Sequence, residues 1–222
     1  MRLALFDLDG TLLPGDSDHA FGEFLVQLGW ADGAEFARRN DGFYADYQRG
    51  RLDIAAYIEF ITEPWRGRPL DEARAASRQF IEKVIEPMLR REAFELIERH
   101  RAAGEQLAIV TATNDFVTRP IADLLGVPDL IATELERDDG GRATGAIRGV
   151  PAYREGKVAR VQAWLAGRGA SLEACERSVF YSDSTNDLPL LERVSDPVAT
   201  NPGPALERLA RERGWPVLKL FE

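Results

Sequence analysis

The sequence has little cysteine and histidine, and it lacks a long apolar run. Its single cysteine, Cys175, cannot form a disulfide within the chain, which favours a reducing compartment. The first residues form only a short apolar run that acidic residues interrupt, unlike a signal peptide or a membrane span of about 20 residues. We therefore expect a soluble, cytoplasmic protein with no membrane partner.

Basic residues are also scarce relative to acidic ones. The chain has 28 Lys and Arg against 37 Asp and Glu, a formal net charge of -9 and a pI near 4.9. No basic stripe is present that could neutralise a nucleic-acid backbone, so we do not expect a nucleic-acid partner. An anionic substrate would need a local positive site, such as a metal ion.

What the sequence does contain is enough apolar material for one core domain and a smaller module, since 45% of its 222 residues are hydrophobic. Apolar segments typical of buried strands lie at residues 2–8, 106–112, 130–134, 178–182 and 197–200. Helical patterns lie at residues 91–103, 116–125, 155–166, 187–193 and 204–213. This alternation predicts an α/β fold in which a parallel sheet is covered by helices on both faces.

The region between the first two predicted strands has a different pattern. From residue 17 to residue 85 the apolar residues follow helical periods without strand-like runs. We predict an all-helical cap domain at residues 15–86, inserted into an α/β core domain of residues 1–14 and 87–222. The turn-rich stretch 135–147 contains an Asp-Gly pair and predicts a hairpin at the sheet edge, without a catalytic role.

Acidic residues follow two of the predicted strands. Asp7 and Asp9 end the first strand, and Asp183 and Asp187 follow the strand at 178–182. Ligands of open parallel sheets bind outside the carboxyl ends of the strands, so these carboxylates could converge on one divalent cation. Each also has an ordinary alternative, as a loop pair, a turn residue or an acid at a helix N-terminus.

Two potential phosphate-binding donors complete the pattern. Thr111 closes the strand at 106–112, and Lys157 lies in the first turn of the helix at 155–166. A hydroxyl and an ammonium group are both suitable donors to phosphate oxygens. Taken singly, Thr111 is also compatible with an ordinary strand end and Lys157 with an exposed surface position.

The order and spacing of these residues resemble the haloacid dehalogenase-like superfamily. Residues 7–12, Asp-Leu-Asp-Gly-Thr-Leu, match its first motif, Thr111 the second, Lys157 the third, and Asp183 with Asp187 the fourth. The resemblance implies a Rossmann-like core, and the place of the helical insertion resembles the C1 cap of the subgroup, subfamily IB, that contains phosphoserine phosphatases.

The resemblance also implies a Mg²⁺-dependent phosphatase acting on a small phosphorylated metabolite. Asp7 would be the nucleophile that becomes phosphorylated, and Asp9 would protonate the leaving oxygen and then activate water. Thr111 and Lys157 would hold the phosphoryl oxygens. The metal would be bound by Asp7, the backbone carbonyl of Asp9, and Asp183, with Asp187 supporting the site.

The motifs depart from phosphoserine phosphatases at two places. Residues 111–114, Thr-Ala-Thr-Asn, replace a serine followed by two glycines, and Ser182 replaces a glycine. Asp16, at the place of a substrate-recognising acid in those relatives, is followed by Ser17 and Asp18. This acidic entrance favours an amine-bearing substrate such as phosphoserine or histidinol phosphate, although Asp16 could equally cap a helix.

Several further residues are weaker candidates. Asn114, which follows the second motif, and Asn186, which lies within the fourth, are expected substrate contacts. Arg49 and Arg51 are possible carboxylate or phosphate contacts from the cap. The two histidines, at positions 19 and 100, are expected to be structural or surface residues.

Two other functions remain open at this point. The same fold could transfer phosphate to another alcohol, and a phosphoaccepting signalling domain also combines acids, a threonine and a lysine on a parallel sheet. In a receiver domain, however, the phosphoacceptor lies on a later strand than the acidic pair. The sequence makes no prediction of the oligomeric state.

Overall fold

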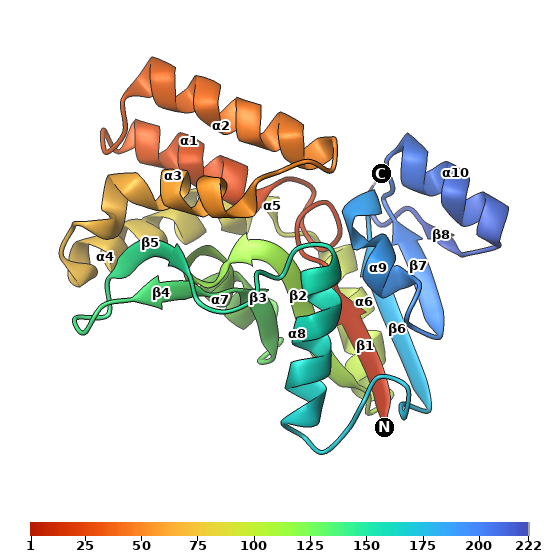
Figure 1. Ribbon diagram of the computed structural model, residues 1–222. Coiled ribbons are helices and arrows are strands. Elements are labelled where there is room, and N and C mark those ends of the chain that lie inside the picture. Colours follow the sequence, from red (N-terminus) through yellow and green to blue (C-terminus); the bar gives the residue numbers. More distant parts are fainter. Residues whose placement is uncertain (222) are drawn as a thin grey trace.

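The computed structural model describes residues 1–221, and its centre is a six-stranded sheet in the order β3-β2-β1-β6-β7-β8 (Figure 1). All neighbouring strands pair in parallel. The strands span Arg2–Phe6 (β1), Gln106–Asn114 (β2), Leu130–Thr133 (β3), Arg177–Ser182 (β6), Asp196–Thr200 (β7) and Val217–Leu218 (β8). The predicted α/β fold is therefore confirmed.

Burial on both faces explains why β1 is the central strand. Leu3, Leu5 and Phe6 have no exposed surface, which is the pattern of a parallel strand covered by helices on both sides. Alternate residues belong to two separate hydrophobic clusters: Phe6 packs in one, whereas Leu3 and Leu5 pack in the other. The alternation places one helical layer on each face of the sheet.

The two layers consist of different helices. The helices of the core span Arg91–Ala102 (α6), Asp115–Leu124 (α7), Glu155–Ala166 (α8), Leu188–Leu191 (α9) and Pro204–Arg213 (α10). Helices α6 and α7 contribute to the cluster that contains Phe6, and α8, α9 and α10 contribute to the other cluster. Figure 1 accordingly shows α8 in front of the sheet and α6 behind it.

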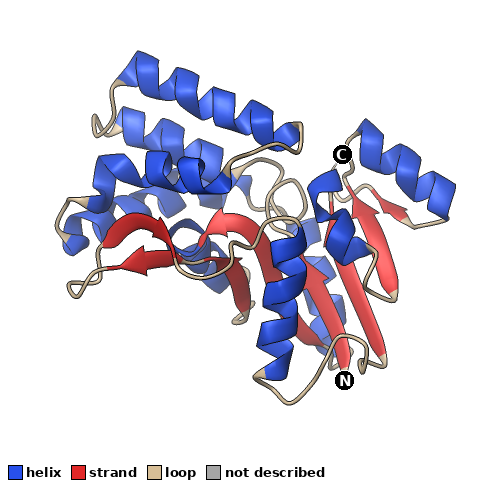
Figure 2. Cartoon of the chain, viewed as in Figure 1, coloured by secondary structure: helices blue, strands red, loops and turns tan. Residues whose placement is uncertain are grey.

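A group of helices lies over the carboxyl ends of the strands (Figure 2). These helices are α1 (Ser17–Gln27), α2 (Gly33–Gln48), α3 (Ile54–Arg66) and α4 (Leu70–Phe80), followed by the π-helical segment η1 (Ile81–Ile85) and α5 (Glu86–Met88). The rings of Trp65 in α3 and Phe116 in α7 stack at 4.2 Å, which joins these helices to the core. The exact division at residues 15–86 remains a prediction, since the helical path runs on to Met88.

The predicted hairpin is present as a separate two-stranded antiparallel sheet. Its strands are β4 (Leu135–Arg137) and β5 (Ala143–Ile147). It packs against helix α3, where the guanidinium group of Arg66 occupies the space that a side chain at Gly145 would fill. The hairpin thus supports the helices above the sheet as well as its edge.

Several predicted boundaries differ from the structure: β1 ends at Phe6 and not at residue 8, and β2 runs on to Asn114 and not only to residue 112. The strand predicted to reach residue 134 ends at Thr133, and β4 begins two residues later. The helix predicted at 187–193 is a 3-10 turn, Thr185–Asp187 (η2), followed by the short α9. Pro189 lies in the first turn of α9, where its missing N–H is tolerated, and so it favours a fresh helix start at Leu188.

Candidate active site

The first functional loop begins directly where β1 ends. The backbone N–H of Asp7 donates to the carbonyl oxygen of Tyr181 at 2.9 Å, which continues the pairing of β1 with β6. Gly10 has a φ of +73°, and a Cβ atom at this position would lie 2.3 Å from a carboxylate oxygen of Asp183. Only glycine permits both this backbone conformation and so close an approach of Asp183.

Lys157 joins the two acidic strand ends. Its Nζ atom lies 2.8 Å from Oδ1 of Asp7 and 2.7 Å from Oδ1 of Asp187. All three side chains are buried, with at most 4% of each exposed. The other oxygen of Asp187 also accepts a hydrogen bond from the Ser182 hydroxyl at 2.7 Å. Asp187 is thus fully engaged in holding Lys157, which favours a positioning role over direct metal binding.

The charge of Lys157 is secured by these partners. Burial lowers the pKa of Lys157, but the neighbouring Asp187 and Asp7 raise it above its ordinary value on balance. The ammonium group therefore remains charged at neutral pH. A buried cation beside Asp7 is suited to a reaction in which a negatively charged phosphate approaches a carboxylate.

Two carboxylate oxygens at the strand ends are without partners. Oδ2 of Asp7 and Oδ1 of Asp183 are buried and accept no hydrogen bond. Burial raises the pKa of Asp7 to about 7 and raises the pKa of Asp183 well above its usual range. Unsatisfied buried carboxylate oxygens are costly without a counter-charge, so this pair fits a hard divalent cation such as Mg²⁺.

The donor set for such a cation would not consist of side chains alone. In the described part of the chain, residues 1–221, no cluster of three or more Asp, Glu, His or Cys side chains forms a complete ligand set. Mg²⁺ commonly takes one or two carboxylates and completes its octahedron with water and substrate oxygens. Asp7, Asp183 and the carbonyl group of Asp9 satisfy that requirement.

Asp9 is oriented by two hydrogen bonds. Its Oδ1 accepts from the backbone N–H of Ser17 at 2.7 Å, and its Oδ2 accepts from the Thr113 hydroxyl at 2.8 Å. Burial, together with the nearby charge of Asp16, raises the pKa of Asp9 to about 7. A carboxyl group with this pKa can both give and take a proton near neutral pH.

A cavity opens beside these groups and extends beneath the cap helices. At one end it is lined by Asp7, Asp9 and Thr111. The remainder of its wall consists of acidic, polar and aromatic side chains, among them Asp16, Asp18, His19, Asn40, Phe43, Tyr44, Tyr47 and Tyr57. A second hollow leads outward past Asp16, Asp183 and the start of α10.

Asp16 has a structural role as well as a place in the wall. It is the N-cap of α1, where its Oδ1 accepts from the backbone N–H of His19 at 2.7 Å. The capping interpretation is thus confirmed. Asp16 also lines both hollows, and its role toward substrate remains a prediction.

The two predicted asparagines make contacts within the protein. Asn114 caps α7 with its Oδ1 and donates from Nδ2 to Asp18 at 3.1 Å, which orients a wall residue of the cavity. Asn186 donates from Nδ2 to the carbonyl oxygen of Tyr47 at 2.9 Å, and this bond links the core to α2. Their direct contact with substrate remains a prediction.

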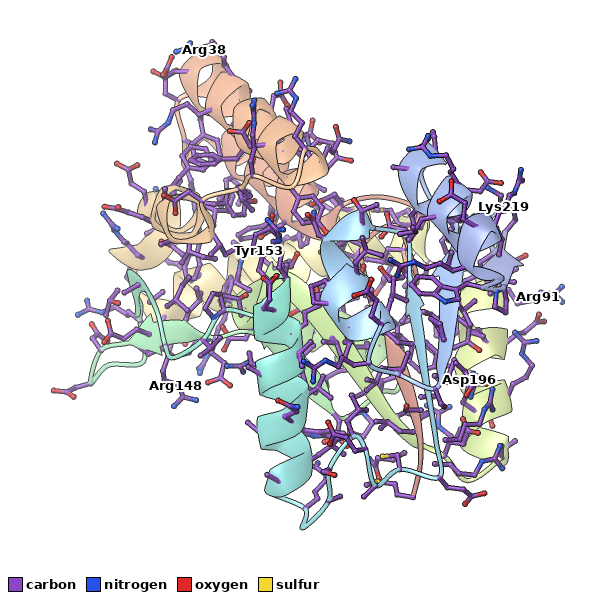
Figure 3. The ribbon with its side chains drawn as sticks, turned by 45° about the vertical axis from the view of Figure 1, so that its right-hand side comes forward. Arg38, Arg91, Arg148, Tyr153, Asp196 and Lys219 are labelled. Carbon is purple, nitrogen blue, oxygen red and sulfur yellow. The ribbon has the colours of Figure 1, made fainter. Side chains whose placement is uncertain are left out.

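A second link between cap and core lies close by. A guanidinium nitrogen of Arg154 donates to the carbonyl oxygen of Gly50 at 3.0 Å. Arg154 has a φ of 53° and its carbonyl oxygen accepts from the backbone N–H of Lys157. Tyr153, labelled in Figure 3, lies at the upper end of α8 below the cap helices, with its ring 6.1 Å from that of Tyr47.

The remaining candidates lie apart from the cavity or within the core. Arg49 and Arg51 pair with Asp46 and do not line the cavity. His100 is buried and bonded to Glu105 and the Tyr181 hydroxyl, as expected of a structural residue. The expectation for His19 was incomplete, because its ring is bonded to Asp41 but also lines the cavity.

Sequence reasoning missed Thr113, Asn40 and Tyr57 in this site. Thr113 stands two residues after Thr111, so strand alternation aims both side chains to the same side, and this signal could have identified it. Asn40 and Tyr57 occupy ordinary helical positions in α2 and α3. Only the folded arrangement reveals that they face the cavity.

Comparisons with known proteins give a consistent result. A family model described as haloacid dehalogenase-like hydrolase matches residues 4–192. A histidinol-phosphatase of Neisseria meningitidis serogroup C (strain 8013) is 43% identical over 217 residues, covering 98% of both proteins. A phosphoserine phosphatase of Mycobacterium tuberculosis (strain ATCC 25618 / H37Rv) is 33% identical over 224 residues, covering 96% of this chain and 69% of that protein.

Solved structures share the fold over almost the entire chain. A protein of unknown function from Bordetella pertussis Tohama I has a TM-score of 0.93 at 50% identity and covers 99% of both chains. A substrate-bound phosphoserine phosphatase has a TM-score of 0.69 at 18% identity, covering 98% of this chain and 92% of that chain. At such low identity the second likeness shows the fold alone.

Proposed function

Because this chain belongs to the haloacid dehalogenase-like hydrolase family, we propose that it is a phosphatase that hydrolyses the phosphate ester of a small amine-bearing alcohol through a phosphorylated Asp7. The observation that carries the proposal is the position of Asp7. It lies at the floor of the cavity, beside the ammonium group of Lys157 and near Asp9. The proposed nucleophile, its counter-charge and the proposed proton donor therefore lie close together.

In the first step, a carboxylate oxygen of Asp7 attacks phosphorus, and the bond from phosphorus to the leaving oxygen breaks. Asp9 gives its proton to that oxygen, so the product leaves as an alcohol. In the second step, Asp9 takes a proton from water as the water oxygen attacks the phosphorus bound to Asp7. The bond from phosphorus to the Asp7 oxygen breaks, inorganic phosphate leaves, and the carboxylate is restored. Bonds to Ser17 and Thr113 hold Asp9 in place for both transfers.

The transferring phosphoryl group carries its charge on its outer oxygens, so positive groups must surround it. Lys157 and the hydroxyl group of Thr111 would bind these oxygens. Mg²⁺ bound by Asp7, Asp183 and the carbonyl group of Asp9 would supply the additional positive charge that offsets repulsion between phosphate and carboxylate. Asp187 keeps Lys157 correctly placed for this purpose.

The substrate class follows from the cavity and from one relative. No lysine or arginine is among the residues that line the cavity in the described chain, whereas Asp16 and Asp18 both contribute to it. Such a wall favours a leaving alcohol with a positive charge. Histidinol phosphate and phosphoserine both bear an amine, and the 43% identical relative is named a histidinol-phosphatase, so histidinol phosphate is the preferred test substrate.

The location and partners of the enzyme follow from composition. The acidic chain is proposed to act on a free metabolite in the cytoplasm, without nucleic acid. Within the described residues, none of the helices combines the length and apolar character needed to cross a membrane.

Phosphate release from a panel of phosphorylated metabolites tests this proposal. The wild type, Asp7→Asn and a control, Asp139→Asn at the exposed tip of the hairpin, are assayed with Mg²⁺ or with chelator. We expect metal-dependent turnover that Asp7→Asn lowers about a thousandfold or more and that the control retains.

The alternatives predict different results in the same experiment. A phosphotransferase would release little inorganic phosphate until an acceptor alcohol is added. A phosphoaccepting signalling domain would accumulate phosphorylated Asp7 with a lifetime far longer than the seconds or less expected here. Either result from folded, metal-loaded protein would overturn the hydrolase proposal.

A further inference from the structure

Two hydrogen-bond acceptors, Asp18 and Asn40, lie in the part of the cavity wall that the cap helices α1 and α2 supply. Asp18 lies in the first turn of α1 with only 5% of its surface exposed. Its Oδ1 accepts from Nδ2 of Asn114, and the Tyr57 side chain lies close enough to stabilise its charged form. Both partners are neutral, so the carboxylate has no buried counter-charge.

Asn40 provides an independent sign of an absent donor. Its Nδ2 donates to the carbonyl oxygen of His19 at 2.9 Å, which fixes the orientation of the amide. Its Oδ1 is then left without a partner, although the residue is only 1% exposed and lines the cavity. A side chain at Gly22 would lie 2.5 Å from this amide, so the glycine makes room for it.

The walls between these acceptors are apolar and flat. Phe43, Tyr44 and Tyr57 present aromatic rings, and Leu52 and Ile54 complete the enclosure. A planar group that carries N–H donors could stack on the rings and satisfy the acceptors at the same time. A carboxylate, in contrast, would meet Asp18 at close range without a neutralising cation.

We propose that Asp18 and Asn40 form a specificity-determining subsite that binds an N–H-bearing cationic or heteroaromatic group, such as imidazole, at the far end of the leaving alcohol. The inference rests on the proposed phosphatase function and assigns the residues that select its substrate. Asp16 lines both hollows and is not assigned to this subsite. The arrangement selects histidinol phosphate over phosphoserine, whose leaving group carries a carboxylate.

Steady-state kinetics on matched esters tests the subsite. The esters are histidinol phosphate and 3-phenylpropyl phosphate, which has a ring of similar size but no N–H donor. The variants are Asp18→Asn, Asn40→Leu and the control Asp46→Asn, a partly exposed aspartate outside the cavity. We expect Asp18→Asn to lower the preference for histidinol phosphate, as a ratio of kcat/KM values, by about 10- to 100-fold, mainly through KM.

Product inhibition gives a second readout that does not depend on catalysis of the preferred ester. Free histidinol should inhibit hydrolysis of p-nitrophenyl phosphate competitively, and Asp18→Asn should raise its inhibition constant by a similar factor. Asn40→Leu should act in the same direction, and Asp46→Asn should match the wild type.

The outcomes separate this inference from the proposed function. Equal loss on both esters, or unchanged inhibition by histidinol, would show that Asp18 has only a structural role and would overturn the subsite while the phosphatase function stands. A wild type without metal-dependent hydrolysis of any ester would overturn the function and the subsite together.

Discussion

The side-chain nitrogen of Asn201 donates a hydrogen bond to the carbonyl oxygen of Gly10 at 2.9 Å. Asn201 follows β7 and has a φ of 45°, which asparagine tolerates better than most residues. Its Oδ1 accepts from the backbone N–H groups of Leu220 and Phe221 at 2.6 and 3.1 Å. One side chain thereby connects the loop that follows β1 to Leu220 and Phe221.

Substitution of Asn201 should separate these two connections. Asn201→Asp keeps acceptors for Leu220 and Phe221 but loses the donor to Gly10, whereas Asn201→Ala loses both. We expect Asn201→Ala to lower the free energy of unfolding by about 1–3 kcal/mol and Asn201→Asp to lower kcat at a smaller stability change. Denaturant unfolding and kinetics check this; equal stability of Asn201→Ala and the wild type would contradict it.

Gly10→Ala should damage the metal site. The added methyl group would meet the Asp183 carboxylate at 2.3 Å, so Asp183 must move. We expect a large rise in the Mg²⁺ concentration needed for half-maximal activity, by about 10-fold or more, since altered support of a ligand typically weakens metal affinity by that factor.

Gly29→Ala is the matched control for this prediction. Gly29 has a similar φ of +69°, but nothing lies within 4 Å of the added methyl group. It should lose about 1 kcal/mol of stability while its Mg²⁺ dependence stays unchanged. A comparable shift of the Mg²⁺ dependence in both variants would show that backbone strain alone, and not Asp183, is responsible.

Lys157→Met should affect stability and activity for different reasons. It leaves Asp7 and Asp187 buried without their shared cation, a change that costs about 3–5 kcal/mol in comparable buried pairs. The double variant Lys157→Met with Asp187→Asn should recover part of this stability, because one uncompensated charge is removed. Neither variant should recover activity, since the phosphate then lacks the ammonium group.

Thermal unfolding in chelator and phosphate release measure the two effects. The contradicting result is a double variant that is no more stable than Lys157→Met. That result would show that charge neutralisation is not what Lys157 contributes to the fold.

The pH dependence of stability should show the effect of burying the Asp18 carboxyl group. Burial, followed by the charges of Asp16 and Asp9, raises the pKa of Asp18 well above its ordinary 3.8. The stability contribution of such a group is fully present below the unfolded-state pKa and is lost as pH rises through the folded-state pKa. Asp18→Asn does not titrate, so its stability relative to the wild type should increase from about pH 4 upward.

Denaturant unfolding in chelator at several pH values measures this difference, with Asp46→Asn as the matched substitution at a partly exposed site. The same pH trend in both variants, relative to the wild type, would contradict the role assigned to burial of Asp18.

The sequence was sufficient to predict the α/β fold and to predict that the acidic ends of two strands lie close together. Short apolar strands followed by helices identify the layers, and the carboxyl ends of parallel strands necessarily share one edge of the sheet. Asp7 and Asp183 were therefore identifiable as neighbours despite their separation. The family resemblance added roles that geometry alone does not assign.

The other features of the site could not be predicted, because they depend on contacts between distant residues that no local sequence pattern encodes. Asp18 belongs to the acidic entrance by sequence, but its contacts with Asn114 and Tyr57 arise only when α1, β2 and α3 pack together. Asn201 matches no motif, because its importance comes from backbone partners at both ends of the chain. Asp187 was expected near the metal, but its ion pair with Lys157 could not be predicted, because that pair depends on how the two side chains are placed in the fold.

Two of the hydrogen bonds between cap and core lie next to the catalytic lysine and its partner. Asn186, which binds the Tyr47 carbonyl, immediately precedes Asp187, and Arg154, which binds the Gly50 carbonyl, lies one helical turn before Lys157. Each bond ties a backbone segment of the cap region to a residue one to three positions from a catalytic group. The placement of the Lys157 ammonium group and of its partner Asp187 is thereby coupled to the position of α2 over the sheet.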